Sequence, residues 1–148
     1  MDAQRSSALE CNCLALRQAA RHVTQFYDRH LGEAGLRATQ FSILKKIHRL
    51  GRTTINALAA EMVMDRTTLG RNILPLEREG LIVIEQAPSD RRIRALRLTP
   101  AGKRRLTRAL QLWAEAQAQF EASFGGKRSA QLRSILRSVV ASPLEKRA

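Results

Sequence analysis

The sequence has few of the features that mark a membrane, secreted or metal-binding protein. No apolar run approaches the length of a membrane-spanning helix. The start of the chain, Met-Asp-Ala-Gln-Arg-Ser-Ser, lacks the apolar core of a signal peptide, so we expect a cytoplasmic protein. Two cysteines, Cys11 and Cys13, are then expected to be reduced. His22, His30 and His48 show no metal-ligand spacing, and we predict no metal and no other cofactor.

Sequence motifs of enzymes are also missing. The chain has no Gly-rich phosphate loop, no Gly-x-Ser-x-Gly turn and no His-Glu-x-x-His pair, so nothing argues for catalysis. It also has no internal repeat and no low-complexity tract. A length of 148 residues favours one domain spanning residues 1–148.

Acidic residues are scarce, with 13 Asp+Glu against 26 Lys+Arg, a formal net charge of +13 and a sequence pI near 11.4. Such an excess of positive charge indicates a polyanionic partner. Nucleic acid is favoured over a membrane surface, because the basic residues are spread along patterned segments and do not form a polybasic tail.

The stretch from Asp65 to Leu81 indicates a helix that exposes one face for recognition. Asp65 is placed to cap its N-terminus, Pro75 should kink or loosen it, and Gly80 suits the left-handed conformation that ends a helix. The apolar side carries Leu69, Ile73, Leu76 and Leu81. The other side carries side chains that donate to phosphates and base edges, namely Arg66, Thr67, Thr68, Arg71 and Asn72. We predict that this face contacts DNA.

The residues before this helix predict a helix-turn-helix. Thr39 is expected to cap a helix that ends at Leu50. A short extended segment at Thr53 and Thr54 should then lead into a compact helix that ends near Met62, with a tight connection to Arg66.

The residues after Gly80 predict a β-hairpin wing. Apolar residues alternate in two runs, Ile82 with Ile84 and Leu96 with Leu98, on either side of a turn. The tip contains Asp90, Arg91 and Arg92, and a purely structural turn does not require these arginines. The winged helix-turn-helix lobe should therefore cover residues 39–99.

Long helices flank this lobe. Apolar residues repeat in steps of three and four from Leu9 to Leu31, and a seam of this kind on a long first helix often needs a second chain to cover it. Thr99-Pro100 should begin a helix that ends at Phe124, where Gly125-Gly126 separates it from a last helix. The predicted fold is mainly α, with a winged helix-turn-helix core and helices at both ends.

This arrangement resembles the MarR family of bacterial transcription regulators over nearly the whole chain. Asp90-Arg91-Arg92-Ile93-Arg94-Ala95-Leu96-Arg97-Leu98-Thr99-Pro100-Ala101-Gly102 is similar to the wing signature of the family, Asp-x-Arg followed by Leu-Thr-x-x-Gly. Leu76-Glu77-Arg78-Glu79-Gly80-Leu81-Ile82 resembles the end of the family's recognition helix. Glu85 and Gln86 depart from the pattern, because many members carry basic residues there.

The resemblance implies a homodimer on a palindromic operator in double-stranded DNA. Residues 9–31 and 103–141 would be the dimerisation helices, and the two recognition helices would enter successive major grooves. Arg92 would enter the minor groove, with Asp90 orienting the wing arginines. Members of the family most often act as repressors.

The two cysteines allow two interpretations. On one helix they would point about 200° apart, so we expect no shared metal and no bridge between them. Cys13 on the apolar seam is either a small core residue or, by its similarity to the peroxide-sensing OhrR branch over Asn12–Leu16, a reactive thiol. Tyr27 falls where that branch has a tyrosine, but about 21 Å of helix separates it from Cys13, so contact requires a dimer. Arg17 replaces the second tyrosine of that branch.

A small-molecule site is expected where the flanking helices meet the lobe. Its predicted walls are Phe41, His48 and Trp113, and Arg17 and Arg21 favour an aromatic or acyl carboxylate ligand. The leading hypothesis is a homodimeric, sequence-specific DNA-binding regulator, a repressor that a ligand or an oxidant releases. The alternative from another class is a basic module that binds RNA or an acidic protein and needs neither wing nor two-fold symmetry.

Overall fold

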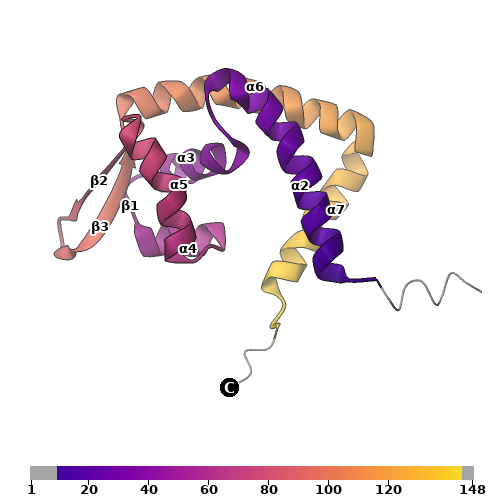
Figure 1. The fold of residues 1–148 in the computed structure, drawn as a ribbon, viewed down its shortest axis with the longest axis horizontal. Coiled ribbons are helices and arrows are strands. Elements are labelled where there is room, and N and C mark those ends of the chain that lie inside the picture. The colour runs from indigo at the N-terminus through magenta and orange to yellow at the C-terminus, as the bar shows by residue number, and fades with distance from the viewer. Residues whose placement is uncertain (1–9, 145–148) are drawn as a thin grey trace, which may run out of the picture. The chain divides into compact units, whose positions relative to one another are not determined.

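A computed structural model describes residues 10–144. The chain separates into two compact units whose boundary lies inside α6, one up to Trp113 and one from Ala114 onward. Figure 1 shows the elements: α2 (Asn12–Leu31), η1 (Gly32–Ala34), α3 (Ala38–Leu50), β1 (Thr53–Thr54), α4 (Ile55–Met62), α5 (Arg66–Arg78), β2 (Ile82–Ala87), β3 (Asp90–Leu98), α6 (Pro100–Phe124) and α7 (Gly126–Ala141). The mainly helical fold with a hairpin wing is confirmed.

The helix-turn-helix consists of α4 and α5, and local hydrogen bonds set its ends. Thr54 caps α4, because its hydroxyl oxygen accepts a hydrogen bond from the backbone N–H of Ala57 at 3.0 Å. Asp65 caps α5, as predicted. The helix α5 continues through Pro75 to Arg78, and Gly80 ends it with a φ of 71°.

The start of α3 differs from the prediction. The N-cap residue is Arg37 and not Thr39, and the helix begins at Ala38. Gln40 Oε1 accepts the backbone N–H of Arg37 at 3.0 Å, and the Asp28 carboxylate on α2 accepts that of Ala38 at 2.7 Å. A side chain from the preceding helix therefore caps α3, which the local sequence pattern could not show.

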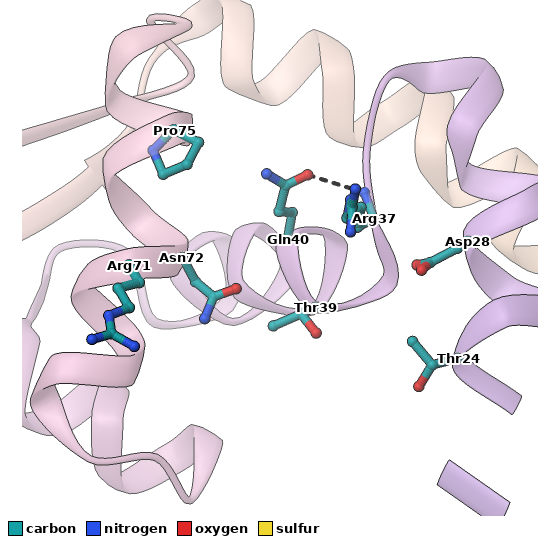
Figure 2. Close-up of a pocket in the computed structure, with 8 residues that line it drawn as sticks. All are labelled: Thr24, Asp28, Arg37, Thr39, Gln40, Arg71, Asn72 and Pro75. Atoms are coloured by element: carbon teal, nitrogen blue, oxygen red, sulfur yellow. Dashed lines mark hydrogen bonds between the residues drawn. The ribbon is translucent and has the colours of Figure 1, made fainter. Parts of the chain in front are cut away.

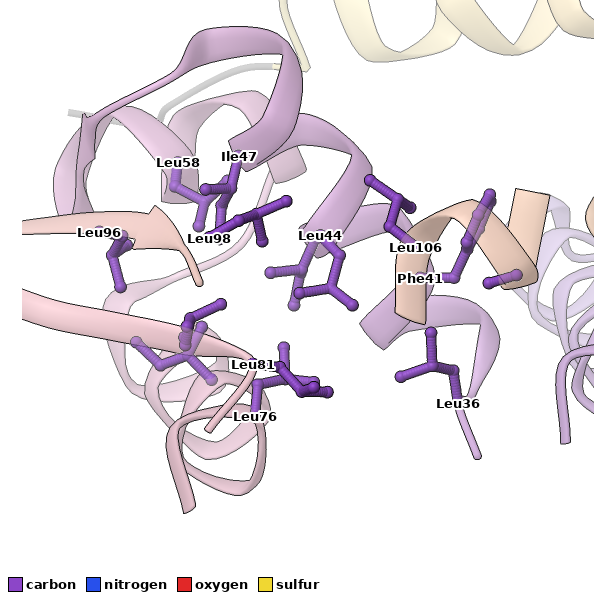
Figure 3. Close-up of a cluster of buried hydrophobic side chains, with 14 of the residues drawn as sticks. Leu36, Phe41, Leu44, Ile47, Leu58, Leu76, Leu81, Leu96, Leu98 and Leu106 are labelled. Carbon is purple, nitrogen blue, oxygen red and sulfur yellow. The ribbon is translucent and has the colours of Figure 1, made fainter. Parts of the chain in front are cut away.

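The core of the first unit lies between α3, α4, α5, the sheet and the beginning of α6 (Figure 3). Leu44 and Ile47 of α3 are fully buried there, as are Leu58 of α4 and Leu76 of α5. Burial of side chains of this size contributes about 1.5–3 kcal/mol each relative to exposure. The apolar side predicted for α5 is confirmed, because Leu69, Ile73, Leu76 and Leu81 are all buried.

The sheet has three antiparallel strands in the order β1-β3-β2. The extended segment predicted before α4 is a strand, since Thr53 pairs with Leu96 and Thr54 with Ala95. In the hairpin, Ile82 pairs with Leu98 and places both side chains in the core. The wing is therefore fixed to the helices at its base.

The end of the wing is joined to the end of α5. The hydroxyl of Thr99 donates to the carbonyl of Gly80 at 2.6 Å and accepts the N–H of Gly102 at 3.0 Å, which caps α6 as predicted. A Cβ atom on Gly102 would overlap the carbonyl oxygen of Leu81. The Thr-x-x-Gly spacing thus has a steric cause, because only glycine lets α6 approach the backbone of Leu81.

The second unit contains the end of α6 and α7. Gly125 separates them with a φ of 101°, and its carbonyl accepts two hydrogen bonds from Ser129, one from the backbone N–H and one from the hydroxyl. Large apolar side chains remain exposed on α7, among them Ile135 at 60% and Val140 at 64%. No helix in residues 10–144 is long and apolar enough to cross a membrane.

Candidate nucleic-acid interface

The first turns of α5 form an exposed polar face. Arg66, Thr67 and Arg71 lie on it with exposed side chains. Within residues 10–144, the guanidinium groups of Arg66 and Arg71 donate no hydrogen bond to the protein and form no ion pair. These two arginines therefore have all their donors available for an external acceptor.

Thr68 and Asn72 lie on the same helix but bond within it. Thr68 donates its hydroxyl to Asp65 Oδ2 at 2.8 Å, and its backbone N–H donates to Asp65 Oδ1 at 2.7 Å. Asn72 donates its side-chain N–H to the carbonyl of Thr68 at 2.8 Å. The side chains of both residues are thus already engaged in the helix.

The carboxylate of Asp65 is stabilised in its charged form. The backbone N–H of Thr68, followed by the hydroxyl of Thr68, holds the pKa of Asp65 below its usual value. This negative charge at the N-terminus of α5 also suits the positive end of the helix dipole.

The wing tip contains a bulge that follows from the strand register. Ala87 pairs with Asp90 but Gln86 pairs with Arg94, so Arg91, Arg92 and Ile93 have no partner on β2. Extra residues of this kind bend a strand and redirect its side chains. The bulge is basic and exposed, and the hairpin that carries it projects away from α4 and α5 in Figure 1.

Asp90 holds the bulge together. Its Oδ1 accepts the backbone N–H of Arg92 at 2.9 Å and the Nε of Arg92 at 3.3 Å, while Oδ2 accepts the terminal nitrogen at 3.4 Å. The side chain of Arg92 is still 90% exposed. The spacing Asp-x-Arg therefore has a physical basis, because a carboxylate accepts most readily from the N–H two residues later.

Glu85 of β2 binds two arginines that no motif of the sequence marked as functional. Arg97 Nε of β3 lies 2.6 Å from Glu85 Oε1, and Arg52, just before β1, lies 3.1 Å from Oε2. The acidic residue that departs from the family pattern is thus neutralised across the three strands. Glu85 pairs with Ala95, two residues before Arg97, so the two charges are diagonal neighbours on adjacent strands, and this register could have indicated the first contact.

The residues predicted to bind a ligand are divided between the core and the surface. Phe41 and Trp113 stack with ring centroids 6.1 Å apart, but Phe41 is only 4% exposed and belongs to the core. His48, Arg17 and Arg21 are exposed on the surfaces of α3 and α2. The two aromatic rings meet as expected, with Phe41 in the core and Trp113 packed against it.

A cavity of about 350 Å³ lies elsewhere in the first unit, and its walls are polar. Figure 2 shows α5 on one side, α2 on the opposite side and the start of α3 between them. It is lined by Thr24, Asp28, Arg37, Thr39, Gln40, Arg71, Asn72 and Pro75. Two residues predicted to contact DNA, Arg71 and Asn72, are therefore also walls of this cavity.

The cysteines lie at the beginning of α2, and both are exposed. Cys11 is the N-cap, with a φ of −89° and a ψ of 115°, and its Sγ accepts the N–H of Leu14 at 3.4 Å. Cys11 thus precedes the helix, and the geometry expected for two cysteines on one helix does not apply. In this chain Cys13 is not a core residue, whereas Tyr27 is half-buried. Within residues 10–144 no cluster of residues suits a metal ion.

Comparison with known proteins identifies the family. The model of the MarR family matches residues 36–93. The structure of the transcriptional regulator MosR from M. tuberculosis in complex with DNA is 36% identical and covers 89% of this chain and 98% of its own, with a TM-score of 0.77. The chain belongs to the MarR family. MarR-family proteins are DNA-binding transcription regulators, so the prediction that the chain is not an enzyme is confirmed.

Other relatives agree with this assignment to the MarR family. The transcriptional repressor CouR, bound to a 23-mer DNA duplex, is 25% identical and covers 95% of this chain and 97% of its own, with a TM-score of 0.82. A candidate regulator of the hcr operon from Thauera aromatica is 32% identical over 108 residues, 73% of this chain. The chain spans 61% of the length of that protein and 61% of the regulator MhqR from Bacillus subtilis.

Proposed function

We propose that this MarR-family protein is a homodimer that binds a palindromic operator and represses transcription. The observation that carries the proposal is the exposed basic face of the first unit. Arg66 and Arg71 on α5, and Arg91 and Arg92 at the wing tip, have exposed side chains. A helix with such residues in its first turns fits the major groove, and an arginine on a narrow wing fits the minor groove.

Exposed apolar side chains support the dimer. Leu14 and Leu16 on α2 are 51% and 41% exposed, and Ile135 and Val140 on α7 are more exposed still. A second copy that covered these residues would remove the apolar surface from water. Two recognition helices in such a dimer would lie about 34 Å apart and favour half-sites one helical turn apart.

The experiment begins with DNA that the protein retains from its own genome, which supplies the operator. Gel-shift titration then compares that duplex, a scrambled duplex and a structured RNA. A preference for the operator supports a sequence-specific regulator. Equal affinity for all three probes would mean that counterion release alone drives binding. It would favour the basic RNA- or acidic-protein-binding module. Sedimentation at micromolar concentration must show a dimer, and a stable monomer contradicts the model.

The polar cavity supports a small-molecule effector. Arg37 and Arg71 can pair with a carboxylate, and Asp28, Thr24 and Thr39 can accept hydrogen bonds from a hydroxyl group. We therefore infer an aromatic or acyl carboxylate that also carries a hydroxyl. The side chain of Arg71 cannot contact this ligand and DNA at the same time. The ligand and the operator would therefore weaken each other's binding by the same factor.

Calorimetry with benzoate, 4-hydroxybenzoate and 3-hydroxybutanoate tests the effector proposal. Binding of the hydroxylated carboxylates, lost in Thr24→Val and weaker in the presence of the operator, supports it. Arg21→Ala is the matched control, because Arg21 is exposed on the same helix and does not line the cavity. Equal loss in Arg21→Ala and Thr24→Val places the ligand elsewhere.

A thiol-based redox sensor of the same fold is the second candidate, supported by the exposure of both cysteines. A thiolate would attack the O–O bond of a peroxide, giving a sulfenic acid on the protein and releasing an alcohol or water. Peroxide should then abolish operator binding in the natural protein, while Cys13→Ser binds DNA and ignores the oxidant. Cys11→Ser is the control for the neighbouring thiol. If Cys13→Ser and Cys11→Ser both lose operator binding in peroxide like the natural protein, the single thiols are not the sensor and the signal is to be sought at the cavity.

A further inference from the structure

Val63, in the turn between α4 and α5, has an unfavourable backbone conformation. Its φ is 53° and its ψ is 45°, and no other residue except glycine in residues 10–144 has a positive φ. The left-handed region is disfavoured for all L-residues and most of all for β-branched ones, because Cβ crowds the following carbonyl.

The surrounding turn imposes this conformation. The N–H of Val63 donates to the carbonyl of Ala60 at 3.2 Å, and that of Met64 donates to the carbonyl of Ala59 at 2.9 Å. This pair of hydrogen bonds ends α4 in the way that usually places glycine or asparagine at the position of Val63. The tight turn explains the positive φ but does not explain the valine.

The side chain of Val63 gains little from the fold. It is 71% exposed, whereas Met64 packs against the core. Valine therefore carries two costs at this position, an unfavourable φ and an apolar side chain in water. Strain that the fold does not require is a reason to look for a function.

The position of Val63 relative to α5 suggests that function. Asp65, two residues later, caps α5, and Arg66 is the first residue of the helix. When the start of α5 enters a groove, the turn before it faces the strand of sugars and phosphates at the edge of that groove. Valine has no hydrogen-bonding group for a phosphate, but its methyl groups suit the C–H surface of a deoxyribose.

We propose that Val63 makes an apolar contact with a deoxyribose at the groove edge and so adds a sequence-independent term to DNA binding. The inference depends on the proposed function, in which α5 enters the groove. A valine is stiff at χ1, so its side chain loses little freedom when it is buried against DNA. Its methyl groups would be buried only in the complex, which accounts for their exposure in the free protein.

Val63→Gly tests the proposal because stability and affinity should not change together. Glycine removes the strain, so Tm should stay the same or rise. Affinity should fall about three- to tenfold, and equally on operator and scrambled DNA. The slope of log Kd against log salt concentration should not change, because no charge is removed. Val63→Ala, which keeps a Cβ atom and therefore part of the backbone strain, should lose affinity with a Tm between those of the natural protein and Val63→Gly.

Two controls separate the possible outcomes. Leu50→Ala removes another exposed apolar side chain, at the end of α3, and should leave DNA affinity unchanged. Arg66→Ala should weaken binding and reduce the salt slope. If Arg66→Ala weakens binding and Val63→Gly does not, the contact at Val63 is overturned and the proposed function stands. If neither weakens binding, α5 does not enter the groove. A loss restricted to the operator means a base contact and overturns the deoxyribose assignment.

Discussion

The carboxylate of Asp28 on α2 accepts a 2.7 Å hydrogen bond from the backbone N–H of Ala38 at the start of α3. This bond caps α3 from another helix and fixes one wall of the polar cavity. Asp28→Ala should lower the free energy of unfolding by about 1 kcal/mol, as the loss of an N-cap does. Asp28→Asn keeps an acceptor and should lose less. Urea denaturation measures both, and equal losses would show that the charge matters more than the hydrogen bond.

The pH dependence of stability should contain a contribution from Asp65. The N–H and hydroxyl of Thr68 lower the pKa of Asp65 in the folded protein. The unfolded chain therefore binds the proton more tightly, and the stabilisation is complete above the unfolded pKa of about 3.9. It is lost as pH falls from there through the lower folded pKa. Asp65→Asn should match the natural protein in stability at low pH and be less stable at neutral pH. Urea titrations measure the free energy of unfolding of both, and a difference that stays constant across pH contradicts the prediction.

Arg71 should distinguish the operator from random DNA if it contacts a base. Arg71→Ala should then weaken operator binding by about 1–3 kcal/mol more than binding to random DNA. Thr68→Ala and Asn72→Ala should cost less, because both side chains already bond within the helix. Arg104→Ala, exposed on α6, is the charge-matched control. Uniform weakening on both duplexes makes Arg71 a phosphate contact.

The wing should contribute through a tip held by Asp90. Arg92→Ala should reduce affinity most for operators with an A·T-rich, narrow minor groove beside each half-site, where the negative potential is deepest. Asp90→Ala should have a similar effect, because it releases the N–H and the guanidinium of Arg92. Asp90→Asn keeps the acceptor for the N–H and should retain more affinity. If Arg92→Ala binds such operators with unchanged affinity, the wing does not contact the DNA.

Gly102 should not tolerate a side chain. Gly102→Ala should destabilise the protein by about 3 kcal/mol, at the upper end of the cost of overpacking, because the new Cβ meets the carbonyl oxygen of Leu81. Gly70 of α5 is the control, since a Cβ there meets no atom within 4 Å. Gly70→Ala should stabilise the helix by about 0.5–1 kcal/mol. Thermal denaturation compares the two, and a stable Gly102→Ala would show that α6 can shift away from Leu81.

The sequence predicted best the features that neighbouring residues determine. The cap at Asp65, the helix stop at Gly80 and the start of α6 at Thr99 each depend on contacts within a few residues, and each is confirmed. The alternating apolar residues of the wing also gave the correct strands, because one face of the hairpin must reach the core.

Features that distant residues determine could not be predicted in this way. The cap of α3 comes from Asp28 on another helix, and the polar cavity forms only where α2, α3 and α5 meet. Cys11 was expected on the helix, but the apolar repeat does not show where the first turn begins. The sequence also could not decide whether Thr68 and Asn72 contact DNA or bond within α5, because side chains that bind DNA also cap and bond helices.

The bulge at the wing tip, closed by Asp90, also affects the thermodynamics of association. A flexible loop that must order itself on DNA loses conformational entropy at the moment of binding. Here the carboxylate already holds the backbone of the tip through the N–H of Arg92 before any partner arrives. Part of the ordering of the tip thus takes place during folding, and in the proposed complex the wing would enter the groove as a preorganised surface.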